Sequence, residues 1–246
     1  MLDPDLQDLI VLSPHLDDAA LSVGGLIHRV CRAGGRALVA TFCTGQPAPE
    51  QVPPGLAHFA DLPTRRAEDA RALARLGAEP RWLGFVDRIF RAPRLPLAAL
   101  MTLAPPDEPG LLDQLAPMRS AIEGLLTERP RARCLCPLAI GLHRDHQAVW
   151  QAGLQVLRAR AAAARFAFYE DVYAWLDPRA ERPAEPGLAL APASAPLGPE
   201  DGRAQLEAVG EYASQLPALG GLARLGRLLA ERRAALGGAE RLWEVA

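Results

Sequence analysis

The chain contains no lysine, so all 27 of its basic residues are arginines. A lysine nucleophile or a Schiff base is therefore excluded, because the reacting amine is absent. Aromatic residues make up only 5% of the 246 residues and the net charge is −2, which does not fit a nucleic-acid surface with stacking platforms. Half of the residues are hydrophobic, enough for the core of one α/β domain. We expect a small-molecule substrate, and the sequence leaves open whether the chain forms a homo-oligomer.

Long apolar runs are also missing. No stretch reaches the roughly 18 apolar residues of a membrane span, and the first residues, MLDPDLQDL, lack the basic and apolar regions of a signal peptide. The four cysteines, Cys31, Cys43, Cys134 and Cys136, form no CxxC pair and lie in apolar stretches. Buried free thiols fit a reducing compartment. We therefore expect a cytoplasmic protein without a membrane span.

Short apolar runs alternate with helical patterns along the chain. This alternation predicts a single domain over 1–246, with a Rossmann-like parallel sheet of strand order about 3-2-1-4-5 and helices on both faces. The region 88–116 is rich in proline and has no clear period, so we expect a variable loop, an insertion or a lid there. A possible edge strand at 187–191 and a C-terminal helical segment over 202–246, with helices near 202–215 and 222–236, complete the expected domain.

Two polar motifs directly follow two of the expected strands. The segment SPHLDD at 13–18 follows the first strand, and HRDH at 143–146 follows the fourth. In the expected order the ends of these strands are neighbours at the switch point, where open α/β sheets bind ligands. Two histidines and one carboxylate supply the three protein ligands of a catalytic zinc and leave a fourth position for water. The motifs therefore predict a metal-dependent hydrolase.

The spacing within each motif suggests a division of roles. Adjacent side chains point apart, so Asp17 and Asp18 do not serve one ion equally: one ligates while the other faces the water. His146, at a helix start, can bind metal while His143, one turn earlier, faces the substrate. A bound zinc lowers the pKa of its water toward about 7, a carboxylate takes the proton, and a neighbouring cation stabilises the oxyanion.

Each of these residues also has a structural interpretation. Taken alone, Asp18 and Asp145 are typical helix N-caps, and a capping Asp145 can also orient His143. We interpret His28 and His58 as structural because neither lies at a strand end. Three histidines and three aspartates at one switch point, however, favour a functional site.

The two motifs resemble those of the PIG-L/LmbE-like N-acetylglucosaminyl deacetylases, which carry a PHPDD-type motif after the first strand and an HxDH-type motif after a later one. Further segments resemble the family: RRAE at 65–68 with LG at 76–77, WLGFVD at 82–87, FYED at 168–171 and YASQ at 212–215. The similarity spans about 9–216. It implies one Zn²⁺ per chain, with His15, Asp18 and His146 as its ligands. It also implies that Asp17 is the general base, which later passes its proton to the leaving amine.

The resemblance implies further roles around the metal. His143 is the implied oxyanion stabiliser and Asp145 the residue that orients it. Arg65 matches an arginine that contacts substrate in the family, while Asp87 and Glu170 are weaker candidates for the pocket.

The sequence departs from the family pattern at a few positions. Arg66 beside the matched arginine leaves the register of that segment open. Leu16 stands where proline is usual, Ala19 where many members have glutamate, and Gln205 where lysine often precedes the YASQ-type segment. None of these removes an implied ligand or the base.

The resulting prediction is a hydrolase that removes an N-acetyl or other N-acyl group from an amino sugar or a similar small molecule. One alternative keeps the metal chemistry but changes the substrate, giving a deacylase for longer chains or an amidase for a non-sugar metabolite. Another is a non-enzymatic sugar-binding protein on the same scaffold, which would be expected to lose a ligand or the base.

Overall fold

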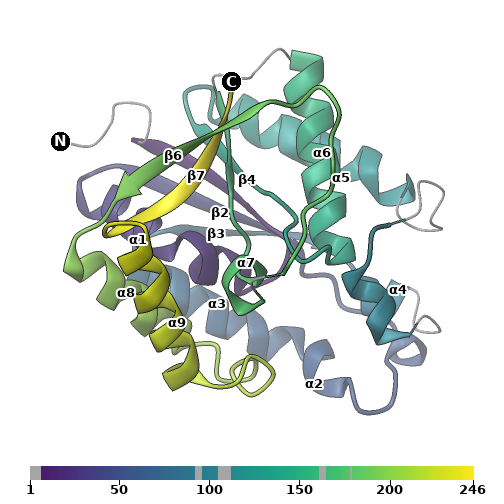
Figure 1. The fold of residues 1–246 in the computed structure, drawn as a ribbon. Coiled ribbons are helices and arrows are strands. Elements are labelled where there is room, and N and C mark those ends of the chain that lie inside the picture. Colours follow the sequence, from purple (N-terminus) through teal and green to yellow (C-terminus); the bar gives the residue numbers. More distant parts are fainter. Residues whose placement is uncertain (1–6, 92–95, 105–111, 161–164, 178) are drawn as a thin grey trace.

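The structure is a computed structural model that describes residues 7–91, 96–104, 112–160, 165–177 and 179–246. These residues form a seven-stranded sheet in the order β3-β2-β1-β4-β5-β7-β6 (Figure 1). The strands are Asp8–Ser13 (β1), Arg36–Cys43 (β2), Glu79–Phe85 (β3), Arg133–Pro137 (β4), Phe166–Tyr169 (β5), Leu190–Pro196 (β6) and Ala239–Val245 (β7). The α-helices are Asp18–Arg32 (α1), Ala57–Ala60 (α2), Leu62–Leu76 (α3), Arg88–Arg91 (α4), Leu112–Glu128 (α5), Arg144–Arg160 (α6), Tyr173–Leu176 (α7), Pro199–Val209 (α8) and Leu222–Ala235 (α9), with 3-10 turns at Pro49–Gln51 and Leu97–Met101.

The expected order 3-2-1-4-5 is confirmed for the five parallel strands. Successive side chains of a strand point to opposite faces of the sheet, so they pack into the core on different sides of it. In β1, Leu9 and Val11 pack with α1, α3 and α8, whereas Ile10 and Leu12 pack with α5 and α6. Figure 1 shows these helices on the two faces of the sheet. Such burial on both faces explains why β1 reads as a continuous apolar run.

The end of the chain corrects the expected C-terminal helical segment. After α9 the chain turns at two glycines with positive φ, Gly237 and Gly238, and returns as β7. This strand lies between β5 and β6 and is antiparallel to both, so the sheet is mixed. The expected edge strand at 187–191 is found a few residues later, as β6.

The proline-rich region 88–116 contains more regular structure than the sequence indicated. It includes α4, the turn at Leu97–Met101 and the start of α5, which begins at Leu112 and carries Pro117 within it. The parts at 92–95 and 105–111 lie outside the described residues, so the expectation of a lid is not tested there. No helix of the described chain is both long and apolar enough to cross a membrane.

Helix α1, which begins at Asp18, is bent at Val23, where φ and ψ are −137° and 23°. Beyond the bend, the amides of Gly25 and Leu26 donate to the two carboxylate oxygens of Glu240 in β7, at 3.1 and 2.9 Å. Before the bend, two carbonyl groups of the helix accept hydrogen bonds from the Gln205 side chain. The bend frees backbone amides and carbonyls of α1, and side chains from β7 and α8 form hydrogen bonds with them. A Cβ at position 25 would lie 2.6 Å from Leu197 Cδ1 and 2.8 Å from Glu240 Oε1, so glycine allows these two side chains to approach the helix this closely.

Candidate metal centre and active site

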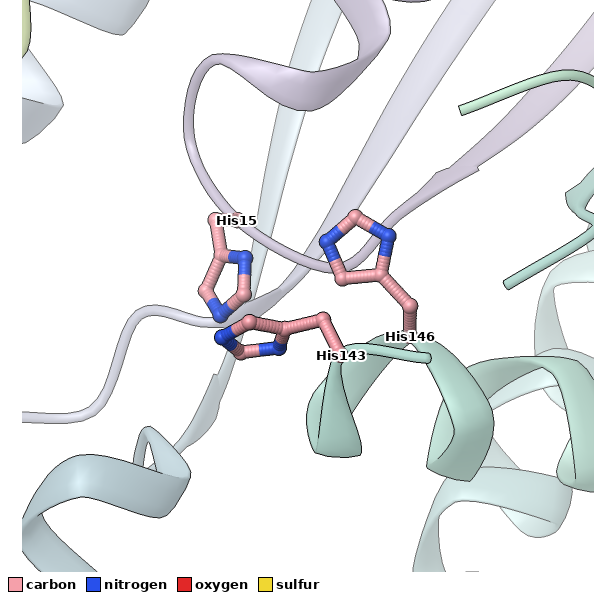
Figure 2. Close-up of side chains that lie close together, drawn as sticks. All are labelled: His15, His143 and His146. Carbon is pink, nitrogen blue, oxygen red and sulfur yellow. The ribbon is translucent and has the colours of Figure 1, made fainter. Parts of the chain in front are cut away.

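The two sequence motifs meet at the carboxyl ends of β1 and β4, where the direction of chain progression through the sheet reverses. His15 lies in the turn between β1 and α1, while His143 and His146 lie at the start of α6 (Figure 2). The three ring centroids are 4.9 to 5.3 Å apart. One nitrogen from each ring lies within 4.8 Å of the others, so the group could hold a metal ion. The predicted convergence of the two motifs is therefore confirmed.

Asp18 provides the carboxylate between two of these histidines. Its Oδ2 atom lies 3.1 Å from His15 Nδ1 and 3.1 Å from His146 Nε2. Ligands about 2.0–2.1 Å from a tetrahedral zinc are about 3.3 Å from one another, so the spacing fits a shared ion. Although it lies close to Asp18, the buried His146 Nε2 makes no hydrogen bond of good geometry. A buried polar atom without a partner is costly, and a metal at this point would satisfy it. The donor types and the two measured separations therefore fit zinc.

Asp171 orients His146 by contacting the ring nitrogen that faces away from Asp18. Its Oδ1 atom lies 2.5 Å from His146 Nδ1, and its Oδ2 atom accepts a hydrogen bond from the Ile140 amide at 2.9 Å. Asp171 is fully buried. A carboxylate on the outer nitrogen fixes the tautomer of a metal-binding imidazole. Although burial opposes protonation, Asp18 and Asp171 raise the pKa of His146 to about 9.

Asp145 has different partners from those the motif spacing suggested. Its carboxylate lies 3.3 Å from His15 Nε2, accepts a hydrogen bond from the Arg88 amide at 2.9 Å, and pairs with Arg91. The contact with His143 runs through the backbone instead: the Asp145 amide donates to His143 Nδ1 at 3.3 Å. This corrects the expectation that the carboxylate orients His143. Asp145 supports His15 in the way that Asp171 supports His146.

The loop that delivers His143 is backbone-strained. Ala139 and Leu142 both have positive φ, at 56° and 58°, a region that residues with a Cβ seldom adopt. The side chain of Gln147 holds this loop by donating to the Leu142 carbonyl at 2.5 Å. Burial, followed by the nearby His15 and His146, lowers the pKa of His143 to about 3. His143 is therefore neutral near pH 7 and is not the neighbouring cation that was expected to stabilise the oxyanion.

A cavity of about 420 Å³ opens over the cluster. Asp17, Arg65 and Asp87 are among the residues that line it, and we call these three its polar floor. Arg65 is buried and donates to the Phe59 carbonyl, whereas Arg66 bonds to the Thr44 carbonyl and faces the Trp82 ring. The structure therefore assigns the pocket position to the first of the two arginines.

The general base predicted from the sequence has a suitable environment. Burial and the neighbouring Asp18 raise the pKa of Asp17, while Arg65 opposes this shift. A higher pKa makes a carboxylate a better proton acceptor during catalysis. Asp87 lines the same cavity and lies 3.4 Å from His15 Nε2. Burial and Asp145 raise its pKa to about 6.

Glu170 is not among the residues that line this cavity. Its carboxylate accepts a hydrogen bond from Trp243 Nε1 at 3.0 Å and pairs with Arg232. This placement corrects the expectation that Glu170 belongs to the pocket, because the adjacent Asp171 turns toward the metal centre instead. Tyr173 also enters the site, with its ring parallel to that of His143 at 6.4 Å, and no sequence motif predicted it. The only available signal was its position shortly after a strand end.

The rest of the cavity wall is apolar. Its aliphatic and aromatic residues come from segments far apart in the sequence: Leu21, Leu56, Phe59, Ile89, Leu100, Val172, Leu176, Ala218 and Leu219. This combination of a charged floor and apolar walls is typical of pockets for small organic ligands.

Residues 10–157 match the family model PIG-L, described as GlcNAc-PI de-N-acetylase. The chain belongs to the PIG-L family. The match covers more than half of the chain and includes both metal-centre motifs. The family assignment from the sequence is thereby confirmed. No curated protein matches the chain.

Solved structures extend the PIG-L comparison over the whole chain. An antimicrobial pseudoaglycone deacetylase is 28% identical, with a TM-score of 0.80 and coverage of 98% of this chain and 97% of that one. A teicoplanin deacetylase complex is 27% identical, with a TM-score of 0.81 and coverage of 97% and 98%. A zinc-inhibited form of teicoplanin deacetylase is 25% identical, with a TM-score of 0.80 and the same coverage. The family match and these structures confirm the prediction of a hydrolase that deacetylates an amino sugar.

Proposed function

We propose that this PIG-L protein is a zinc-dependent deacetylase of an N-acetylated amino-sugar conjugate, with His15, Asp18 and His146 holding one zinc ion. The observation that carries the proposal is the position of Asp18 Oδ2, which lies 3.1 Å from His15 Nδ1 and 3.1 Å from the buried His146 Nε2, a nitrogen that makes no hydrogen bond of good geometry. When bound there, zinc would supply Lewis acidity for the amide carbonyl and lower the pKa of water. Asp171 and Asp145 hold the outer nitrogens of the two histidines.

Asp17 is the proposed general base. It lines the cavity next to a ligand of the metal, and its raised pKa favours proton uptake from water. The proton it takes then serves the leaving amine, since amide cleavage requires the nitrogen to depart in protonated form. Arg65, which also lines the cavity, opposes the rise in the pKa of Asp17, because a nearby cation favours the charged carboxylate.

His143 is proposed to act on the acyl oxygen as a neutral hydrogen-bond donor. Its Nδ1 accepts from the Asp145 amide, which leaves Nε2 to carry the proton. A neutral donor fits the low pKa of His143, and a fixed donor at a developing oxyanion lowers the barrier without charge. Tyr173 lies beside it, and burial followed by Asp18 raises the pKa of the phenol, so the hydroxyl keeps its proton.

The apolar walls favour a substrate that is larger than a free acetylated sugar and carries an apolar group. This supports a conjugate over a monosaccharide, and Asp87 and Arg65 would contact its polar part. We place the reaction in the cytoplasm, as the free cysteines suggested. A deacylase for longer chains remains the second candidate, because the same walls would accommodate an extended acyl group.

The test is acetate release from a panel of N-acetylglucosamine glycosides by zinc-loaded protein, with matched N-octanoyl substrates as the second arm. Asp17→Asn should keep zinc and lose turnover. Asp201→Asn is the control: it changes a buried aspartate, located at the start of α8 and outside the cavity lining. It should retain both zinc and turnover. Failure of the wild type to release acid from either arm would contradict the proposal.

A further inference from the structure

The imidazole of His15 presents its two nitrogens to two different groups of donors. Nδ1 faces Asp18, at 3.1 Å, within the proposed catalytic centre. Nε2 faces Asp145, at 3.3 Å. Cys43 also lies beside His15, and one donor atom each from His15, Cys43 and Asp145 lies within 4.8 Å of the others. All three side chains are buried. In the catalytic centre Asp145 serves only to support His15, and Cys43 has no role.

We propose that His15 Nε2, Cys43 Sγ and Asp145 form a second metal position, which takes a thiophilic divalent cation such as zinc, cadmium or cobalt and thereby inhibits the enzyme.

The fold brings these donors together at the same sheet edge as the catalytic centre. Cys43 is the last residue of β2, and its amide donates to the Pro14 carbonyl at 2.9 Å, which ties it to the turn that carries His15. Asp145 arrives from the first turn of α6. His15 Nε2 and Asp145 Oδ2 are 3.3 Å apart, which is about the separation of two ligands on a tetrahedral zinc. Asp87, at 3.4 Å from the same nitrogen, offers a fourth donor.

The donor types determine which ions the position accepts. Sulfur, nitrogen and carboxylate oxygen together suit zinc and its soft analogues, whereas magnesium and calcium take oxygen ligands. Binding releases the thiol proton of Cys43 and the Nε2 proton of His15 to solvent, and no electron is transferred. The bound ion then replaces the hydrogen bond between His15 and Asp145. His15 loses the support that fixes it for the catalytic centre, so occupancy lowers turnover.

A cobalt titration of the metal-free full-length protein separates the two positions. The catalytic centre contains no sulfur ligand, so the first equivalent of Co²⁺ should bind without a sulfur-to-cobalt charge-transfer band. A second equivalent, counted by equilibrium dialysis, should produce that near-ultraviolet band. Absence of a second equivalent, or its binding without the band, would overturn the proposal with wild-type protein alone.

Variants identify the thiol and link it to inhibition. Cys43→Ser should abolish the band and keep the first equivalent, whereas Cys31→Ser, which changes the partly exposed cysteine in α1, should retain the band. Loss of an outer-shell partner weakens metal binding by about 10- to 100-fold, so loss of the sulfur ligand should raise the zinc concentration that inhibits acetate release by at least about tenfold. A band that persists in Cys43→Ser would refute the assignment. Failure to bind the first equivalent would contradict the catalytic metal centre of the proposed function and not the second position.

Discussion

Replacing Asp171 by asparagine tests how much the hydrogen bond to the outer nitrogen of His146 contributes to metal affinity. The wild-type carboxylate uses one oxygen for His146 Nδ1 and the other for the Ile140 amide. Asparagine has only one acceptor oxygen, so one of these two donors must face an NH₂ group. Either outcome disturbs the metal centre: the imidazole loses its orienting acceptor, or the loop before His143 loses its anchor.

The expected size of the effect follows from these contacts. Outer-shell carboxylates on metal-binding histidines contribute about 10- to 100-fold to affinity, which corresponds to about 1.4–2.7 kcal/mol. Asp171 is fully buried, so solvent does not replace its lost hydrogen bond and the upper half of that range is expected.

The assay is competition for zinc between the protein and a chromophoric chelator, with wild type, Asp171→Asn and Asp201→Asn compared at one pH. Asp201 serves as the control because its carboxylate is also buried but interacts with His28 and the start of α8. Both variants should lose stability, and only Asp171→Asn should lose zinc affinity. If zinc affinity in Asp171→Asn stays within twofold of wild type, the support role of this carboxylate is refuted.

Three further predictions address the other groups. His15→Ala should retain little zinc by elemental analysis, because two ligands no longer make a catalytic set, and undiminished zinc would show that the ligand assignment is wrong. Asp17→Asn should keep its zinc but lose about 10²- to 10⁴-fold in kcat, and a loss of only a few-fold would count against a general base. Glu240, whose pKa burial raises from 4.5 to about 7, binds its proton more tightly when folded, so its contribution to stability is present below pH 4.5 and is lost as pH rises through 7. The difference is about 3 kcal/mol, and denaturant unfolding of Glu240→Gln across this pH range should show a flatter profile than wild type; parallel profiles would contradict it.

The metal centre was largely predictable from sequence because its residues follow strand ends in short motifs. A strand and the turn after it form one local unit, so SPHLDD and HRDH needed only the order of the strands to bring them together. The supporting residues were harder to predict. Glu170 and Asp171 are neighbours, and only the direction in which the backbone leaves β5 decides which carboxylate reaches His146.

The partners of Asp145 show a second limit. A spacing of two residues made His143 the natural partner, yet the carboxylate contacts His15, which is 130 positions away, and Arg91, which comes from a region with no periodic pattern. Contacts of this kind depend on how loops pack against each other. Strand β7 was missed for a related reason: it follows a helical stretch and is only partly buried, so its apolar pattern is weak.

The bend in α1 has a consequence for how the helix folds. The first half of the helix, which starts at Asp18, can form locally, but the carboxylate that accepts from the Gly25 and Leu26 amides is Glu240, 215 and 214 positions later. Until β7 inserts between β5 and β6, these two amides lack this acceptor. The second half of α1 should therefore become fully stable only when β7 pairs, and hydrogen exchange should report protection of these amides and pairing of β7 together.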